Sequence, residues 1–258
     1  MFGTNPLRKK EQTDGLSLRV QKIWHTIQGE GPFAGCPAVF IRLAGCNLRC
    51  YFCDTDFESG YGNVMSVGDV LDQVRSFISY PSLVVITGGE PFRQNILPLC
   101  NALVFSSFRT QLETAGTFWV AGLEMLIKTG AVSLVCSPKS GKVHDAISKH
   151  CQHWKYLINA EEGVDETDGL PNHSTQIQGE RQKLFRPPRT TDTVWLQPCE
   201  VYKNTVKALA IGGPSDQCIT AAAKDVEAFN HNAKFAALLA MKYNYRISLQ
   251  LHKILGLE

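Results

Sequence analysis

The segment CNLRCYFCDT, at positions 46–55, contains three cysteines followed directly by an acidic residue and a hydroxyl. Free thiols have no reason to crowd an exposed loop, and reactive cysteines occur there mainly when they serve a function. The chain contains nine cysteines, an odd number, and in a reducing compartment a tight cluster of thiols binds metal more readily than it forms disulfides. This spacing therefore indicates a bound metal centre.

Length and composition limit the possible classes of protein. At 258 residues and 44% apolar residues, the chain can form one α/β domain, or less readily two small ones. The net charge of +2 provides no basic field for nucleic acid. No segment approaches the roughly 20 apolar residues of a membrane span, and the N-terminus lacks a secretory signal. We expect a cytoplasmic protein with neither a nucleic-acid nor a membrane partner.

Strand-like and helix-like patterns alternate along the chain. LVVIT at 83–87 is a continuous apolar run typical of a parallel strand buried on both faces. Ser66 and Asp69 form a capping box that predicts a helix over 67–79. The expected core strands are 38–43, 83–87, 110–113, 132–136, 154–158 and 193–197, with further strands at 18–24 and 246–251. The other expected helices are 96–105, 120–129, 143–149 and an Ala-rich region over 216–244.

Two segments fall outside this alternation. Residues 1–17 are polar and predict a mobile N-terminal arm, which leaves 18–258 as a single domain. Residues 159–192 contain few periodic apolar residues and many helix and strand breakers, so we expect a loop or a poorly packed insertion.

Six core strands alternating with helices predict a parallel sheet, either an incomplete barrel or an open doubly wound sheet. Unusual polar or glycine-rich motifs follow the strands: CNLRCYFC, GGEP at 88–91, Glu113-Thr114, SPK at 137–139 and QPCE at 197–200. Both architectures place their ligand site at the carboxyl ends of the strands. We therefore expect one site, assembled from these loops.

Two metal centres are compatible with three close cysteines. A structural zinc site requires four ligands. After Cys53 the next cysteine is Cys100 and the next histidine is His144, so no fourth ligand lies close by in the sequence and zinc is disfavoured. Three cysteinates on a four-iron cluster leave one iron open to a substrate or cofactor. The remaining possibility is three unconnected thiols.

CNLRCYFC, together with GGEP after the next strand, resembles the radical S-adenosylmethionine superfamily. TIQGEGPFAGCPAVFIRLAGCNLRCYFCDTD at 26–56 and the later motifs TGGEP, LETAGT, SPK, WLQPCE and RISLQLHKILGLE resemble the 7-carboxy-7-deazaguanine synthase family within it, across nearly the whole chain from about Val20. The resemblance implies an incomplete, TIM-like barrel of about six parallel strands. Cys199 stands where this family pattern leads us to expect methionine or another apolar residue.

The resemblance also implies a role for individual residues. Cys46, Cys50 and Cys53 would hold a 4Fe-4S cluster, and the hydroxyl of Thr55 would bind Mg²⁺, a hard cation that prefers oxygen ligands. The residues implied to contact S-adenosylmethionine are Gly88, Gly89, Glu90, Glu113, Ser137, Pro138, Lys139, Gln197, Pro198, Cys199 and Glu200. Those implied to contact the substrate are Gln28, Gly29, Glu30, Arg42, Thr87, His252 and Glu258.

Each polar candidate also has a purely structural interpretation. Arg42 could belong to a structural ion pair, because a buried arginine requires a partner. Glu30 could occupy a turn and Thr55 could cap the following segment. Lys139 could be a solvated charge, and His252 a polar side chain satisfied by its neighbours.

The implied reaction converts 6-carboxy-5,6,7,8-tetrahydropterin to 7-carboxy-7-deazaguanine with loss of ammonia, in queuosine and other deazapurine biosynthesis. A 5′-deoxyadenosyl radical would remove the hydrogen at C6 before the ring contracts. The implied partners are this pterin, an electron donor such as flavodoxin or ferredoxin, and a second copy of the chain in a homodimer. The rival functions are another small radical enzyme, such as a glycyl-radical activase, and a non-catalytic zinc-binding module.

Overall fold

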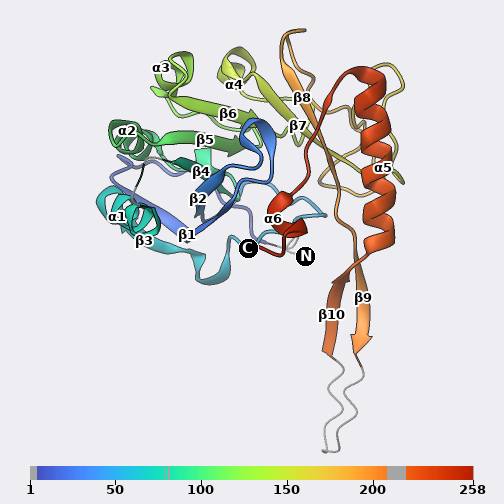
Figure 1. The fold of residues 1–258 in the computed structure, drawn as a ribbon, viewed down its shortest axis with the longest axis horizontal. Helices are drawn as coiled ribbons and strands as arrows, with labels where there is room; N and C mark the ends of the chain where they lie inside the picture. The colour runs from blue at the N-terminus through green and yellow to red at the C-terminus, as the bar shows by residue number, and fades with distance from the viewer. Residues whose placement is uncertain (1–4, 79, 81, 208–218, 258) are drawn as a thin grey trace, which may run out of the picture.

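A computed structural model describes residues 5–78, 80, 82–207 and 219–257. Nine strands form one sheet in the order β11-β8-β7-β6-β5-β4-β2-β1-β3, and β9 and β10 form a separate hairpin that extends away from the body (Figure 1). The strands are β1 (Ser17–Ile27), β2 (Pro37–Leu43), β3 (Asn63–Ser66), β4 (Leu83–Gly88), β5 (Arg109–Thr114), β6 (Val132–Cys136), β7 (His153–Ile158), β8 (Thr193–Pro198), β9 (Tyr202–Lys207), β10 (Ile219–Lys224) and β11 (Arg246–Ile247).

The six expected core strands are confirmed as β2, β4, β5, β6, β7 and β8. Each is parallel to the next, and they lie side by side in chain order. Sequential neighbours are the arrangement of a barrel, whereas a doubly wound sheet reverses its strand order at a switch point. The sheet ends at β3 on one side and β11 on the other without closing, so the fold is a partial barrel.

Helices cover the outer face of this curved sheet, as Figure 1 shows for α1 to α4. Helix α1 begins as expected, because the Ser66 side chain accepts from the Asp69 backbone N–H and the Asp69 carboxylate accepts from the Ser66 backbone N–H. The helices are α1 (Val67–Phe77), α2 (Leu97–Phe105), α3 (Leu123–Lys128), α4 (Asp145–His150), α5 (Val226–Tyr243) and α6 (Leu251–Ile254), and short 3₁₀ turns lie at Gly31–Phe33, Ser59–Tyr61 and Pro91–Arg93.

Alternate residues of each strand face opposite sides of the sheet, and the two sides differ in polarity. On β7, Trp154 and Tyr156 belong to the main apolar core between sheet and helices. The opposite, concave face has a much smaller apolar core, formed by Ala38, Phe40, Leu83 and Val85. The rest of the concave face is therefore left for polar side chains, and this is where the candidate site lies.

Two sequence expectations near the C-terminus were wrong in part. The Ala-rich region expected to be helical over 216–244 contains strand β10 at Ile219–Lys224, and α5 starts only at Val226; its first residues, 216–218, lie outside the described residues. The strand expected over 246–251 is only two residues long, and the chain turns into α6 at Leu251.

Both segments outside the alternation contact the body. In the N-terminal segment, Arg8 N donates to Cys46 O at 2.7 Å and Glu11 N donates to Arg93 O at 2.7 Å. Residues 159–192 contain no helix or longer strand, as expected for a loop, yet Leu170 and Leu184 are buried. Within the ranges that the structure describes, no helix combines the length and apolar character needed to cross a membrane.

Candidate active site

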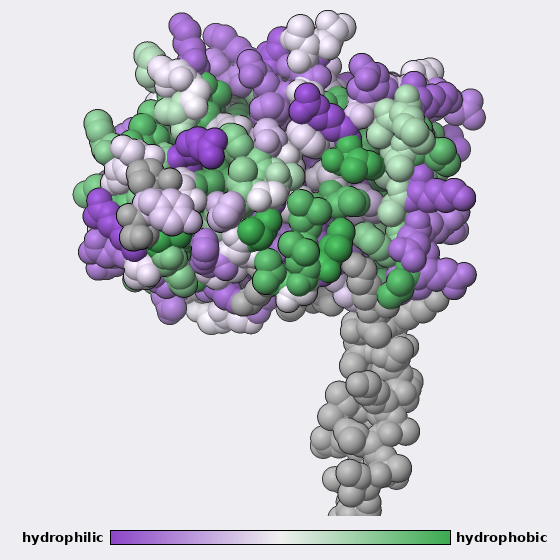
Figure 2. All heavy atoms as spheres, viewed as in Figure 1, coloured by the Kyte–Doolittle hydropathy of each residue, from purple (hydrophilic) through white to green (hydrophobic). Residues whose placement is uncertain are grey.

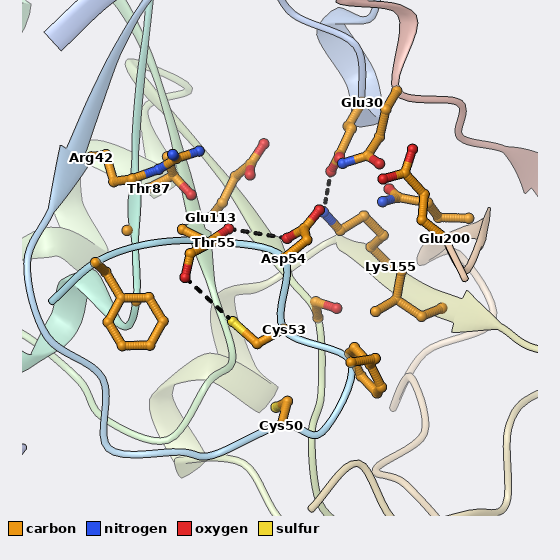
Figure 3. A pocket seen from close by; sticks show the side chains of 18 of the residues that line it. Glu30, Arg42, Cys50, Cys53, Asp54, Thr55, Thr87, Glu113, Lys155 and Glu200 are labelled. Atoms are coloured by element: carbon orange, nitrogen blue, oxygen red, sulfur yellow. Dashed lines mark hydrogen bonds and ion pairs between the residues drawn. The ribbon is translucent and has the colours of Figure 1, made fainter. Parts of the chain in front are cut away.

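A cavity of about 480 Å³ runs from the carboxyl ends of the core strands into the concave face of the sheet (Figure 3). It brings together most of the residues singled out from the sequence, although they come from segments far apart in the chain. The predicted residues that line it are Gln28, Glu30, Arg42, Cys46, Cys50, Cys53, Thr55, Thr87, Gly88, Gly89, Glu113, Ser137, Lys139, Gln197, Pro198, Cys199, Glu200 and His252.

The cysteine loop follows β2 and packs against the end of β4. A Cβ atom added at Gly89 would lie 2.4 Å from the carbonyl oxygen of Gly45 and 2.7 Å from the Cβ of Cys46. Contacts this short do not occur in real proteins, so only glycine allows the two loops to approach. The glycine of the GGEP motif thus sets the position of the first cysteine.

The three thiols are suited to an iron-sulfur cluster. All eight cysteines among the described residues are free, and Cys46, Cys50 and Cys53 face one cavity. Burial raises the pKa of Cys46 to about 12 and that of Cys53 to about 11, so ionisation requires a bound cation or cluster. No three His, Cys, Asp or Glu side chains in the described part converge on a single metal ion. A four-iron cluster separates its thiolate ligands more widely than one ion does, so this donor set fits the cluster better than zinc.

The cavity wall beside the cysteines carries Ser137 and Lys139, from the loop after β6. The Lys139 ammonium donates to the Ser137 carbonyl at 3.2 Å and to its hydroxyl at 2.6 Å. Burial lowers the pKa of Lys139, opposed by the nearby Cys50. Lys139 is thus a half-buried cation at the cavity wall rather than a solvated surface charge.

Arg42 is the most unusual cation of the site. It lies on β2 beside Thr87 of β4, and Figure 3 shows both side chains near Glu113. Its guanidinium carbon lies 4.8 Å above the centre of the Trp24 ring. Its Nε is buried without a hydrogen-bond partner, and no carboxylate of the described residues forms an ion pair with it. Burial lowers the pKa of Arg42, with Asp54 and Glu113 opposing. A half-buried guanidinium that forms no ion pair is a ready site for an anion.

A hydrogen-bonded group fixes the orientation of Gln28. Its Oε1 accepts from the backbone N–H of Glu30 at 3.0 Å, so its Nε2 must face the carboxylate of Glu113, also at 3.0 Å. Gln111 Nε2 donates to the same Glu113 oxygen at 2.9 Å. Glu30 forms an ion pair with Lys155 of β7, and both side chains are largely buried, with 9% and 12% of their surfaces exposed.

The charges of this group depend on one another. Burial by itself would raise the pKa of Glu30, but the charge of Lys155 holds the pKa of that carboxyl below its ordinary value. Burial raises the pKa of Glu113, with Lys155 opposing. Burial by itself would lower the pKa of Lys155, but the carboxylates of Glu30 and Glu113 raise that pKa above its ordinary value. One ammonium therefore stabilises two buried carboxylates, as a paired site requires.

The C-terminal helix α6 closes one side of the cavity. Lys253 Nζ lies 2.7 Å from Asp54 Oδ2 and 2.7 Å from Glu200 Oε2. His252 Nδ1 is buried without a partner, and a Cβ atom added at Gly29 would lie 2.5 Å from it. Gly29 therefore allows α6 to pack directly on the loop that carries Gln28 and Glu30.

Four predicted residues are not part of the cavity lining. Glu90 is buried beneath it and accepts from Thr114 Oγ1 at 2.7 Å and from the backbone N–H of Ala115 at 2.8 Å, which joins the ends of β4 and β5. Pro138 and Gly29 are buried and do not line the cavity. Glu258 lies outside the described residues.

Five charged residues of the cavity were not predicted from the sequence: Lys22, Arg49, Asp54, Lys155 and Lys253. A lysine in the middle of the apolar strand WKYLI was the available signal for Lys155, since such a strand rarely carries a charge without a partner. Lys253 gave no signal, because its two partners are remote in sequence.

Comparisons with known proteins agree with this geometry. Residues 40–160 match the Radical SAM superfamily. The chain is 40% identical, over 257 residues, to the 7-carboxy-7-deazaguanine synthase of Rhodospirillum rubrum, with 99% of each protein covered. It is 34% identical, over 269 residues, to the 7-carboxy-7-deazaguanine synthase of Rickettsia prowazekii, with 100% of this chain and 96% of that relative covered.

Among solved structures, the crystal structure of QueE from Escherichia coli is similar. It superposes with a TM-score of 0.58 and 22% sequence identity, over 93% of this chain and 99% of that one. At this identity the likeness supports the partial-barrel fold and says nothing further about individual residues.

Proposed function

This chain belongs to the family of 7-carboxy-7-deazaguanine synthases, which are radical S-adenosylmethionine enzymes, and on that basis we propose how its cavity performs the reaction. It is a lyase that converts 6-carboxy-5,6,7,8-tetrahydropterin to 7-carboxy-7-deazaguanine with loss of ammonia. Membership of this family leaves no place for the glycyl-radical activase or the zinc-binding module.

One observation carries the proposal. Three free thiols and the half-buried guanidinium of Arg42, whose Nε has no hydrogen-bond partner, face the same cavity. The thiols suit a cluster with an open iron, and the guanidinium suits a carboxylate substrate. One cavity would thus accommodate both the radical source and the pterin acid.

Cys46, Cys50 and Cys53 would ligate the 4Fe-4S cluster, beside which S-adenosylmethionine would occupy the space between the loops after β4, β6 and β8. When bound, the cluster and this cofactor supply a radical that removes a hydrogen atom from the substrate. Gly88 and Gly89 line the cavity and would meet the methionine portion with their backbone. The cavity is also lined by Ser137, Lys139, Gln197, Pro198, Cys199 and Glu200, and these residues would orient the cofactor.

The pterin would lie between Arg42 and the Gln28–Glu30 loop. Arg42 would hold the substrate carboxylate, and Thr87 lies beside it on the next strand. Gln28 and Glu30 would bind the amide and amine edges of the ring, held in place by Glu113 and Lys155. Glu113 lies within this group, so we assign it to the substrate rather than to S-adenosylmethionine. These preorganised groups position the substrate before reaction, which lowers the cost of orientation.

We further propose that Thr55 provides a ligand to Mg²⁺. Its hydroxyl lines the cavity and donates to Asp54 Oδ1 at 3.1 Å, so one hydroxyl and one carboxylate oxygen lie together. Oxygen ligands of this kind suit Mg²⁺, which commonly bridges a protein oxygen and an acidic ligand. The cation would orient the substrate carboxylate.

The enzyme requires a reductant, and a small electron carrier such as flavodoxin or ferredoxin is the donor we propose. We also propose a homodimer, as the family resemblance implies. Figure 2 shows apolar side chains gathered over the part of the surface where α6 lies, and Ile254, Leu255 and Leu257 there are exposed. Exposed apolar groups of this kind favour contact with another protein surface.

The proposal is tested by anaerobic incubation of the reconstituted protein with reductant, S-adenosylmethionine, Mg²⁺ and 6-carboxytetrahydropterin, followed by mass spectrometry. Formation of 7-carboxy-7-deazaguanine is expected. Formation of 5′-deoxyadenosine alone would contradict the substrate assignment while leaving the radical chemistry in place.

A further inference from the structure

The polar insertion contacts the loop that carries the cysteines. Arg49 N donates to Gln176 Oε1 at 2.8 Å, and Tyr51 N donates to the carbonyl of Thr175 at 3.1 Å. These two peptide N–H groups flank Cys50. The insertion therefore holds the backbone on both sides of the central cysteine.

The same contacts determine which way the Gln176 amide points. Because Oε1 accepts from a backbone N–H that cannot act as an acceptor, Nε2 must be the atom near the sulfur. Gln176 Nε2 lies 3.2 Å from Cys50 Sγ and 2.7 Å from Thr175 Oγ1. The Thr175 hydroxyl donates its own hydrogen to the carbonyl of Lys139 at 2.9 Å. Thr175 Oγ1 thus accepts one amide hydrogen, and the second hydrogen is directed at the sulfur.

The segment that presents Gln176 is held in place by its own hydrogen bonds. The Ser174 hydroxyl accepts from the backbone N–H groups of Gln176 and Ile177, at 3.2 and 3.1 Å. Ser174 N donates to the carbonyl of Glu180 at 2.7 Å. Ser174 and Thr175 are 2% and 3% exposed. A buried and internally bonded turn of this kind presents its neighbour in a fixed geometry.

We propose that Gln176 is a positioning residue that donates a hydrogen bond to the sulfur of Cys50 and thereby raises the reduction potential of the cluster. The inference rests on the proposed binding of the cluster by Cys46, Cys50 and Cys53. A hydrogen bond to a ligating sulfur stabilises the electron-rich reduced form more than the oxidised form, and such bonds are among the factors that set cluster potentials. The insertion would in this way make the cluster easier for the electron donor to reduce.

The test is an anaerobic redox titration of the reconstituted cluster, followed by electron paramagnetic resonance, on wild type and Gln176→Met. Methionine is similar in size and uncharged but cannot donate to sulfur. We expect the equilibrium constant for reduction of the cluster to be tenfold smaller in Gln176→Met than in wild type. This corresponds to a midpoint potential about 59 mV lower for one electron. Gln178→Met is the matched control, because Gln178 is exposed in the same loop; its potential should equal that of wild type.

Iron and sulfide content are measured on every sample. A wild-type protein that fails to assemble a four-iron cluster would contradict the proposed function rather than this inference. If Gln176→Met lacks a cluster, Gln176→Glu is titrated instead, since glutamate keeps an acceptor for Arg49 N but has no donor. An unchanged potential in either variant would overturn the inference. Loss of the cluster from both would also overturn it, because a donor that only tunes the potential is dispensable for assembly.

Discussion

The ammonium of Lys253 lies 2.7 Å from the carboxylate of Asp54, although 199 positions separate them in the chain. Asp54 directly follows the third cysteine, so this contact joins the C-terminal helix to the cysteine loop. Lys253 also binds Glu200, at 2.7 Å, from the loop after β8. One cation therefore connects three segments around the cavity mouth.

Replacing Lys253 should loosen this connection. In Lys253→Met the carboxylate of Glu200, whose side chain is 6% exposed, loses a cationic partner. We expect a loss of about 1.5–3 kcal/mol in the free energy of unfolding, the usual contribution of a hydrogen bond to a charged group. Urea denaturation of the apo-protein measures it. Lys234→Met, at an exposed position of α5, is the control and should change stability by less than about 0.5 kcal/mol.

Lys155 and Glu30 should behave as a coupled pair. Lys155→Met leaves a buried carboxylate without its partner, which typically costs about 3–5 kcal/mol. Combining it with Glu30→Gln removes that charge, so the double variant should be more stable than Lys155→Met alone. A double-mutant cycle from denaturation curves tests this expectation. Strictly additive effects of the two substitutions would contradict a direct ion pair.

The pH dependence of stability should reveal Glu113. Burial raises its pKa in the folded protein above the ordinary value of 4.5, with Lys155 opposing, so the folded state binds the proton more tightly than the unfolded chain does. Stability contributed by this group is present below pH 4.5 and is lost as the pH rises through the folded pKa. The stability that Glu113→Gln gains over wild type should therefore be larger at pH 7.5 than at pH 5. Equal differences at both pH values in urea denaturation would refute the raised pKa.

Arg42 should govern substrate binding and not the cleavage of S-adenosylmethionine. Arg42→Lys keeps the charge but loses the planar pair of donors. A lost charge-assisted hydrogen bond is worth about 1.5–3 kcal/mol, so kcat/KM for the pterin should fall by about 10- to 100-fold. Release of 5′-deoxyadenosine without substrate should stay unchanged. Arg75→Lys, at an exposed position on α1, provides the comparison; a fall in 5′-deoxyadenosine release in Arg42→Lys alone would argue against the assigned role.

The core strands and much of the cavity could be predicted because their signals are local. LVVIT indicates a buried parallel strand by its unbroken apolar character, and the motif SPK directly follows a strand. Tertiary pairing is not a local property. Residues 219–224, ITAAAK, contain alanines with high helix propensity, but they pair with β9 as a strand. The strand near the C-terminus likewise shortens to Arg246–Ile247 because the chain turns into α6.

The charged residues that organise the site were harder to predict, because their partners are also remote in the sequence. Lys155 faces the cavity because side chains alternate along β7, and its partner Glu30 comes from another part of the chain. The contact between Gln176 and Cys50 spans 126 positions. A breaker-rich segment such as 159–192 correctly indicates a loop, but it carries no local signal for the surface on which that loop packs.

Cys46, Cys50 and Cys53 are proposed to hold the cluster that drives the reaction, and a series of single substitutions tests this role. Cys46→Ala, Cys50→Ala, Cys53→Ala and the control Cys36→Ala are reconstituted, and each is assayed for iron, sulfide and 7-carboxy-7-deazaguanine. We expect cluster and product to be lost together in the first three proteins and retained in Cys36→Ala. Product formation in any of the first three, at the wild-type rate, would contradict the claim.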